Sequence, residues 1–439
     1  MNSDFPGWRL RAACTLLVLC ASTYAHATIE LDDAIAMAQA NDPWLAGSHL
    51  REEALRADGI AASSLPDPMV SVGLANLPTD TFDFDQEPMT QFKVGFSQVF
   101  PRGQSRALGQ QRYRLLGEAQ PHHRADRQAG IAREVTRLWL QAYRASASIE
   151  LIERDRGLFE QLLEVVQTSY TSALGRTRQQ DLIRAQLELT RLDERLSRLR
   201  EDQQTALSQL LEWLSPADYG ALPALSMTGR PEIALLRRDL VATAGTPDEA
   251  LIGQLLSRHP AILATDAKVS ASAATIAIAE QGYRPQWRLD ASYGYRDDDP
   301  LRGDRADFFS IGVAFDLPLF TEKRQDQGVR SATAATEALR TERALLLRRL
   351  YATFESERTR LALLEERQQL YEERLLAETR EQAEASLSAY TSDDGDFAEV
   401  VRARIAELNA NIEALDIDVQ RLMSISQLNY LLAGEEVSS

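Results

Sequence analysis

The sequence predicts a mainly α-helical fold with a small β part, in which long antiparallel coiled-coil helices accompany four short strands. Three observations lead to this fold class. Apolar residues recur every 3.5 positions over stretches of roughly 70 residues, as in coiled coils. Two other segments alternate apolar and polar residues, as strands do. The whole arrangement occurs twice along the chain, which indicates an internal repeat.

The clearest β signal is the segment Trp287–Phe315. Polar or small residues alternate with the apolar set Trp287, Leu289, Ala291, Tyr293, Tyr295, Phe309, Ile311, Val313 and Phe315. An acidic turn at residues 297–307 separates the two arms, so the segment is predicted to form a β-hairpin. The apolar face would meet a second sheet in a soluble sandwich, or lipid in an outer-membrane barrel.

Residues 1–27 have the pattern of a secretory signal peptide, with Arg9 and Arg11 before a short apolar run. A small-x-small cleavage site ends the segment at Ala27. Both cysteines lie within it, so we expect no disulfide in the mature chain. Leu19 occupies the position before Cys20 where a lipid-attachment site wants a small residue, and we therefore expect no N-terminal lipid.

The formal net charge is −17, and an acidic exported protein is not expected to bind nucleic acid. No nucleophile triad, phosphate-binding glycine loop or metalloprotease motif is present, so we expect neither an enzyme nor a cofactor. The scattered histidines do not suggest a metal site. No apolar run after residue 27 approaches the roughly 18 residues of a transmembrane helix. Any membrane crossing is therefore expected to use strands.

The spacing of prolines reveals the repeat. Pro43 and Pro68 are 25 positions apart, as are Pro260 and Pro285, and each pair encloses a predicted helix. The predicted units are a signal peptide (1–27), a first repeat (28–214, strands at about 69–100), a connector (215–247), a second repeat (248–433, hairpin at about 286–316) and a tail (434–439).

Each predicted strand pair is followed by a long outbound helix and a return helix. The first outbound helix is expected from near Arg102 to Gly175, with a disturbance at Pro121. In the second repeat the apolar pattern is less regular, and the chain turns at 392–395. At 1.5 Å per residue, about 70 helical residues extend about 100 Å. Such helices are too long for a compact domain.

Four strands cannot close a membrane barrel, because small barrels need about eight. Open sheet edges are not tolerated in lipid, since their backbone groups would have no partner. The strands must therefore be pooled between subunits if they cross a membrane. Three copies would supply about twelve strands and leave a pore, whereas two copies would leave a filled interior.

These features resemble the TolC family of outer-membrane efflux channels over nearly the whole mature length. The resemblance includes the duplicated plan, Asn41-Asp42-Pro43, His259-Pro260, and the turn Tyr170–Gly175 before Leu182. The stretches Leu65–Met69 and Gly95–Gly103 look most like the branch that serves heavy-metal pumps of the resistance-nodulation-division (RND) type. The resemblance implies a homotrimer with a 12-stranded β-barrel in outer-membrane lipid, a periplasmic α-barrel, a periplasmic adaptor and an inner-membrane RND pump.

Two turns are the candidate functional sites. The first contains Asp393, Asp394, Gly395, Asp396 and Glu399, and three copies would form an acidic ring at the pore tip that attracts cations. Gly395 would suit a left-handed backbone position. The alternative is that the acidic residues cap the next helix.

The second turn carries Gly175, Arg176 and Arg178 and could contact the adaptor, or it could be an ordinary solvated turn. The sequence thus predicts a passive exit duct, with heavy-metal cations as the expected cargo. Within the channel class the alternative is a drug-efflux or type I secretion duct. From another class, a structural coiled-coil surface protein is the rival, and the two hairpins argue against it.

Overall fold

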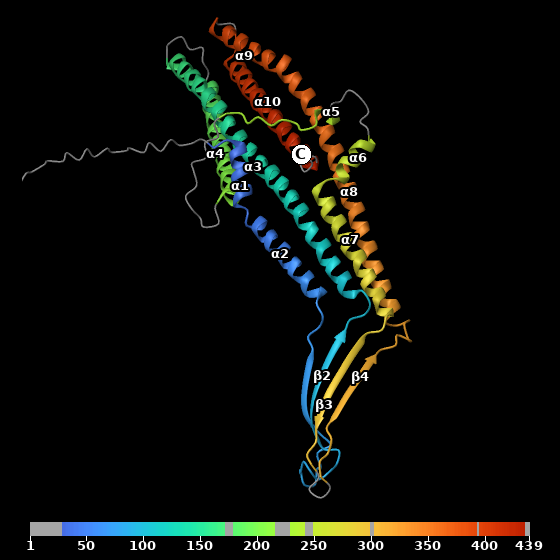
Figure 1. The fold of residues 1–439 in the computed structure, drawn as a ribbon. Coiled ribbons are helices and arrows are strands. Elements are labelled where there is room, and N and C mark those ends of the chain that lie inside the picture. Colours follow the sequence, from blue (N-terminus) through green and yellow to red (C-terminus); the bar gives the residue numbers. More distant parts are fainter. Residues whose placement is uncertain are drawn as a thin grey trace, which may run out of the picture.

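The computed structural model describes residues 29–171, 179–215, 229–241, 249–298, 303–392 and 395–434. The molecule is elongated, with a four-stranded sheet at one end and two long helix pairs that extend away from it (Figure 1). The predicted fold class, mainly helical with four strands, is confirmed. The predicted signal peptide, most of the predicted connector and the predicted turn at Gly175 lie outside the described residues.

The two halves repeat one order of elements. The first half consists of α1 (Leu31–Asn41), α2 (Pro43–Ser63), β1 (Met69–Ala75), β2 (Gln91–Phe100), α3 (Ser105–Thr171) and α4 (Gln179–Leu214). The second half consists of α5 (Arg238–Val241), α6 (Glu249–Ser257), α7 (Pro260–Glu280), η1 (Gln281–Tyr283), β3 (Trp287–Tyr295), β4 (Phe308–Phe315), α8 (Gln325–Leu370), η2 (Tyr371–Leu375), α9 (Leu376–Thr391) and α10 (Phe397–Leu431). Both α2 and α7 have 21 residues, in agreement with the predicted repeat.

The outbound helix of the first half is continuous. It has 67 residues and runs through Pro121, so the expected disturbance of the helix there is wrong. A proline inside a helix removes one backbone hydrogen bond, and the packing of α2, α7 and α10 along α3 outweighs that loss. In the second half, α8 and α9 are joined through one π-helical turn, Tyr371–Leu375. Such a turn accommodates an extra residue, which accounts for the less regular apolar pattern in this repeat.

Helix α7 qualifies the expectation about membrane crossing. Residues Pro260–Tyr283 are long and apolar enough to cross a membrane by length and composition. This apolar segment was not expected from the sequence, because its hydropathy comes from many small alanines rather than from a run of large apolar residues. In the fold α7 packs along α3 and α8, and its Asp266 forms an ion pair with Arg343. It is therefore a helix of the bundle.

The four strands form one antiparallel sheet in the order β1-β2-β3-β4. Val94 lies opposite Val72 on one side and Tyr293 on the other, and Tyr293 lies opposite Phe309. Directly paired residues share a face of an antiparallel sheet. The register therefore gathers the apolar positions of all four strands on the same face.

Three apolar clusters hold the helices together. One joins α6, α7, α8 and α10 around Phe354 and Leu428, and another joins α1, α3 and α4 around Val135 and Leu210. The third lies toward the far end of the helix pairs, where Phe159 of α3 and Leu192 of α4 belong to the same cluster as Phe397 of α10. The second helix pair thus packs on the first through α10.

The two short helices α2 and α7 begin in the same way. Asp42 accepts a hydrogen bond from the backbone N–H of Trp44, and His259 accepts one from Ala261 through Nδ1. In both cases proline occupies the first helical position, where its missing N–H costs nothing. The predicted turns before Pro43 and Pro260 are therefore helix caps.

His259 also binds the last turn of α10. Its side chain is fully buried, Nε2 lies 3.2 Å from the carbonyl oxygen of Tyr430, and the two rings meet edge to face at 5.0 Å. The Tyr430 hydroxyl donates to Asp126 of α3 at 3.0 Å, and the Arg133 guanidinium lies 4.4 Å from the Tyr430 ring centre. This cluster joins α3, α7 and α10 at one point, and we call it the clasp.

The clasp requires a neutral imidazole, because Nδ1 accepts a hydrogen bond while Nε2 donates one. Burial lowers the pKa of His259, although the charge of Asp126 and the bond to Tyr430 oppose that effect. Burial, together with the nearby Asp126 carboxylate, raises the pKa of Tyr430 to about 12. Both groups are therefore uncharged at neutral pH.

The clasp predicts an acid-sensitive stability. Unfolded histidine titrates near pH 6.5, and the folded pKa is lower, so stability falls as the pH drops from about 6.5 through the folded pKa. His259→Asn keeps a helix-capping oxygen but cannot titrate. We expect this variant to be less stable at pH 7.5 and to lose less stability than the parent between pH 7 and pH 5. Thermal unfolding in detergent at several pH values measures both effects, and parallel pH profiles would contradict this role.

Candidate functional site

The outward apolar face of the sheet is the first functional feature. Large apolar side chains on all four strands are between about two-fifths and three-quarters exposed. On the outward face the most exposed are Val70, Val72, Phe309, Ile311 and Val313. A contiguous apolar surface of this extent marks an interaction with lipid or another protein. We call it the strand face.

Aromatic residues lie toward both ends of the strand face. Trp287 and Phe315 are cross-strand partners near the helices, with ring centres 4.8 Å apart. Tyr293 and Phe309 are paired near the opposite end, next to Tyr295. Membrane strands have about 9–11 residues and carry aromatic girdles at both interfaces. The aromatics follow that pattern, and β2 and β3, with 10 and 9 residues, have the full length, whereas β1 and β4 are shorter at 7 and 8 residues.

The opposite face of the sheet is small and polar. It carries Lys93, Ser292, Ser310 and Asp290 together with several glycines. At Gly95 space is tight, because a Cβ there would lie 2.6 Å from the Ser71 Oγ, and the serine side chain would have to turn away. A polar, small-residue face opposite an apolar one is what a water-filled barrel needs inside.

Both edges of the sheet are open in the single chain. Among the described residues, β1 pairs only with β2 and β4 pairs only with β3. Each edge presents a row of unpaired backbone N–H and C=O groups, which can pair with another strand. Strand β1 leads out of α2, and β4 leads into α8, so the two edges lie on opposite sides of the molecule (Figure 1).

The acidic turn is partly described. Asp393 and Asp394 lie outside the described residues, whereas Gly395, Asp396 and Glu399 lie within them. Asp396 is exposed and accepts a hydrogen bond from the backbone N–H of Ala398 at 3.2 Å, so it caps α10. Glu399 in the first turn of α10 forms an exposed ion pair with Arg402 at 2.7 Å. The capping alternative therefore holds for Asp396, whose exposed side chain lies at the tip as well.

The expected left-handed backbone at Gly395 is wrong. Gly395 does not have a positive φ. Its hydrogen instead faces the end of α9, where a Cβ would lie 2.7 Å from the backbone nitrogen of Tyr390. The Tyr390 and Phe397 rings meet edge to face at 5.7 Å across this turn. Glycine is therefore needed for the close approach of two helix ends. The predicted adaptor-contact residues, Gly175, Arg176 and Arg178, lie outside the described residues.

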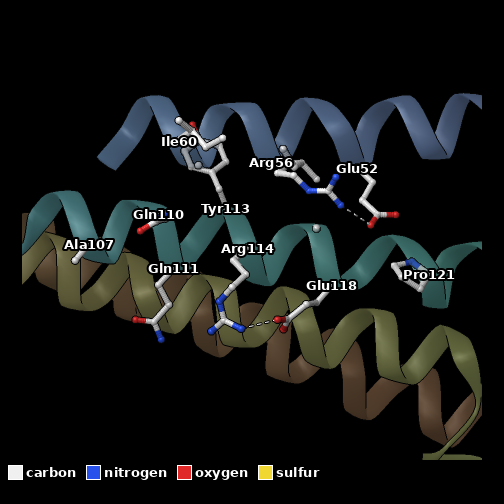
Figure 2. Close-up of a pocket in the computed structure, with 13 residues that line it drawn as sticks. Glu52, Arg56, Ile60, Ala107, Gln110, Gln111, Tyr113, Arg114, Glu118 and Pro121 are labelled. Carbon is white, nitrogen blue, oxygen red and sulfur yellow. Dashed lines mark hydrogen bonds and ion pairs between the residues drawn. The ribbon is translucent and has the colours of Figure 1, made fainter. Parts of the chain in front are cut away.

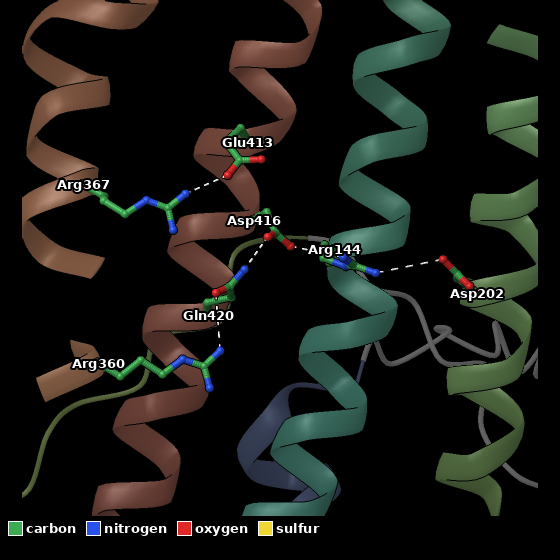
Figure 3. Close-up of polar contacts among 7 residues, drawn as sticks. All are labelled: Arg144, Asp202, Arg360, Arg367, Glu413, Asp416 and Gln420. Carbon is green, nitrogen blue, oxygen red and sulfur yellow. Dashed lines mark hydrogen bonds and ion pairs between the residues drawn. The ribbon is translucent and has the colours of Figure 1, made fainter. Parts of the chain in front are cut away.

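A layer of charged residues crosses the helical body (Figure 3). Arg144 of α3 lies 3.1 Å from Asp416 of α10 and 4.0 Å from Asp202 of α4. Asp416 also accepts a bond from Gln420, which in turn accepts one from Arg360 of α8 at 3.4 Å. The chain of contacts links both helix pairs. We call it the polar layer.

Asp418, one half-turn further along α10, holds the described part of the predicted connector. Arg230 makes two bonds of 2.6 Å to its carboxylate, in a bidentate arrangement. Burial alone would raise the pKa of Asp418, but hydrogen bonds and charges from Arg230 and Arg421 outweigh burial and lower the pKa. Asn429 adds two bonds to the connector, one with the N–H of Leu236 and one with the carbonyl of Ala234.

A groove of about 720 Å³ lies between α2 and α3 (Figure 2). Its walls combine apolar surface from Leu55, Ile60 and Tyr113 with charged side chains. Glu118 pairs with Arg114 at 2.6 Å, on the same helix. The groove lies above the β1 edge of the sheet and is open to solvent in the single chain.

Sequence reasoning did not find the polar layer, the clasp or the groove. Arg144 and Asp416 are separated by 272 positions, so no local sequence spacing predicts their contact. A weak signal existed in both helices, because each residue is charged and lies directly beside a regular apolar position. Only the packing of α10 on α3 decides which of many such charges meet.

Comparisons with known proteins give a family match over part of the chain and a shared fold over most of it. Residues 251–434 match the family described as outer membrane efflux protein. The fold is similar to that of CusC (TM-score 0.75, 16% identity, 92% of this chain and 92% of that chain) and of the outer-membrane channel OprN (0.74, 16%, 92% and 90%). It is also similar to the outer membrane channel CmeC of Campylobacter jejuni (0.73, 13%, 99% and 94%). The sequence has no significant match among curated proteins.

The bond between Arg230 and Asp418 yields a testable prediction. Because the folded pKa of Asp418 is lowered, its stabilising contribution is present at neutral pH and is lost as the pH falls through that pKa. Asp418→Asn should lower the free energy of unfolding by about 1 kcal/mol, a modest loss because Arg230 is half exposed. It should also speed tryptic cleavage within residues 229–241 at pH 7.5. Asp202→Asn, whose contact with Arg144 is long and exposed, is the matched control. Equal cleavage rates in both variants would contradict the assignment.

Proposed function

Because residues 251–434 match the outer membrane efflux protein family and the fold is similar to that of solved outer-membrane channels, we propose that this chain is the exit duct of a tripartite efflux system, passive itself and supplied by an inner-membrane pump. We place it in the outer membrane, with a large periplasmic part. The observation that carries the proposal is the sheet itself, with an exposed apolar face, a polar face and two unpaired edges. In lipid such a sheet must be completed by other copies.

A homotrimer satisfies this requirement best. Twelve pooled strands give a closed barrel with a water-filled interior. Joining β4 of one copy to β1 of the next also brings α8 toward the groove between α2 and α3, because these helices flank the two edges. Exposed apolar residues on both elements, such as Leu345 on α8 and Ile60 on α2, favour this contact.

The far ends of the helix pairs are proposed as the gate. Three copies of the acidic turn at Asp393, Asp394, Asp396 and Glu399 would surround the axis and favour cations. Opening would require α9 and α10 to shift outward relative to α3 and α4, a change between two packed arrangements. The polar layer links α10 to α3, and α3 to α4, so its contacts would be rearranged in that step. The turn with Gly175, Arg176 and Arg178 is proposed to contact the adaptor.

Heavy-metal cations are the proposed cargo, delivered by an RND pump and a periplasmic adaptor. Support comes from the stretches Leu65–Met69 and Gly95–Gly103 and from the acidic turn, which suits cations. A drug-efflux or type I secretion duct shares the same architecture. A structural coiled-coil protein does not account for the strand face. The two repeats are proposed as 28–214 and 248–433, separated by the connector at 215–247.

The gate proposal predicts a change in ion selectivity. Asp393→Asn, Asp394→Asn and Asp396→Asn together remove nine charges from a trimeric ring, while asparagine at 396 still caps α10. We expect the cation-over-anion permeability ratio to fall severalfold in planar bilayers, with the oligomeric mass unchanged. The matched control neutralises Glu30, Asp32 and Asp33 of α1 and its start, and should leave the ratio as it was.

Two outcomes would count against these proposals. Unchanged selectivity in the triple variant, with normal conductance, would remove the acidic gate and leave the duct intact. A detergent-extracted wild-type protein that is monomeric and gives no conductance would overturn the duct.

A further inference from the structure

The link between β4 and α8 contains the most exposed apolar side chains of the molecule. Phe320 is 92% exposed, the highest fraction among the large hydrophobic residues described, and Leu319 and Leu317 are 72% and 63% exposed. The link projects sideways from the junction of sheet and helices (Figure 1). The exposure of three neighbouring apolar side chains is costly in water and indicates an apolar environment.

The beginning of the link continues the strand face. Phe309, Ile311, Val313 and Phe315 alternate along β4, and Leu317 is the next residue in that alternation. Asp316 keeps this part aligned with the sheet, because its N–H donates to the carbonyl of Gln286 and its carboxylate accepts from the N–H of Gln286 at 2.7 Å. The apolar surface therefore extends beyond the paired strands on the helix side.

Charge follows directly after the apolar residues. A turn at Thr321–Arg324 brings in Glu322 and the two cations Lys323 and Arg324, and all three side chains are exposed. In the part of the chain that the structure describes, neither of these two cations has an ion-pair partner. An aromatic residue flanked by basic side chains is typical of the boundary between acyl chains and head groups, where the cations reach the lipid phosphates.

The two ends of the strand face differ in charge. The described parts of the loops at the far end, 76–90, 296–298 and 303–307, carry seven aspartates and one glutamate against two arginines. At the helix end, the chain carries Arg284 before β3, Arg288 at the start of β3, and Lys323 and Arg324 in the link, against Asp316 and Glu322. The helix end is therefore less acidic than the far end, and its cations complement an anionic phospholipid surface.

We propose that residues 317–324 are a membrane anchor, which inserts Leu317, Leu319 and Phe320 at the acyl–head-group boundary of the periplasmic leaflet and places Lys323 and Arg324 on anionic phospholipid phosphates. The inference rests on the proposed barrel and adds a specific lipid contact to it. A neighbouring copy is less suited than lipid to cover these side chains. It would pair with the backbone edge of β4, whereas the link continues the strand face, which is turned toward lipid in the proposed barrel.

Site-directed fluorescence tests the proposal on the full-length oligomer in vesicles. The predicted mature chain has no cysteine, so Phe320→Cys provides a single site for an environment-sensitive dye. Lipids with a spin label near the head group or deep in the acyl chain report the depth of the dye. Ile311→Cys, in the middle of the strand face, is the deep control, and Leu363→Cys on α8 is the control outside the membrane.

The anchor predicts that a dye at position 320 is quenched roughly twofold more by the shallow spin label than by the deep one. At position 311 the order should be reversed, and at position 363 neither label should quench. Quenching at 311 without quenching at 320 would overturn the anchor and leave the barrel intact. A dye at 320 that is shielded from both lipid labels and aqueous iodide would instead show that a neighbouring copy covers it. Absence of quenching at 311 would contradict the proposed function itself.

A charge variant tests the lipid head group separately. For the parent protein we expect the shallow spin label to quench the dye at position 320 more strongly in phosphatidylglycerol-containing vesicles than in zwitterionic ones. The double variant Lys323→Gln, Arg324→Gln should show a smaller gain in quenching. Arg340→Gln with Arg348→Gln, on the exposed surface of α8, is the matched control and should keep the gain. An equal gain in both variants would overturn the assignment of these two cations.

Discussion

Unpaired backbone groups at the two edges of the sheet constrain the whole molecule. Strands β1 and β4 each have one neighbour in the described chain, and the face between them is apolar. Lipid satisfies the apolar face but cannot satisfy backbone N–H and C=O groups. In the proposed membrane location the sheet is therefore incomplete in one chain, and other copies would supply the missing hydrogen bonds. Oligomerisation would in this sense be a condition for the membrane location rather than an addition to it.

The helices connect that membrane part to a distant tip. Helix α3 runs without interruption for 67 residues, about 100 Å at the usual rise. Apolar clusters pack the two helix pairs together, while the polar layer and the clasp fix their alignment through directional bonds. Two helices that touch through apolar side chains can slide past each other more easily than two helices joined by ion pairs or directional hydrogen bonds. The polar contacts are thus well placed to hold one arrangement of helices until the tip is moved.

Much of this architecture was predictable because it depends on local periodicity. The hairpin expected at about 286–316 corresponds to β3 and β4 at 287–295 and 308–315, and the repeat follows from proline spacing. Contacts between distant residues, such as Arg144 with Asp416, were not predictable, since many exposed charges have the same local pattern. Gly395 was assigned the wrong reason, because close packing and a left-handed backbone both select glycine. The effect of Pro121 on its helix was overestimated, because tertiary packing compensates for the one backbone hydrogen bond that the proline removes.

Disulfide scanning between β1 and β4 tests the central claim most directly. Single cysteines at 70, 72 or 74 are combined with one at 309, 311 or 313 in the otherwise cysteine-free mature chain, and the outer-membrane fraction is oxidised before denaturing electrophoresis. These strands lie at opposite edges of one chain, so a bond between them must join different copies. The account predicts that selected pairs form covalent trimers and that single-cysteine controls do not. Failure of every pair in a membrane-inserted, conducting protein would contradict closure of the barrel through these edges.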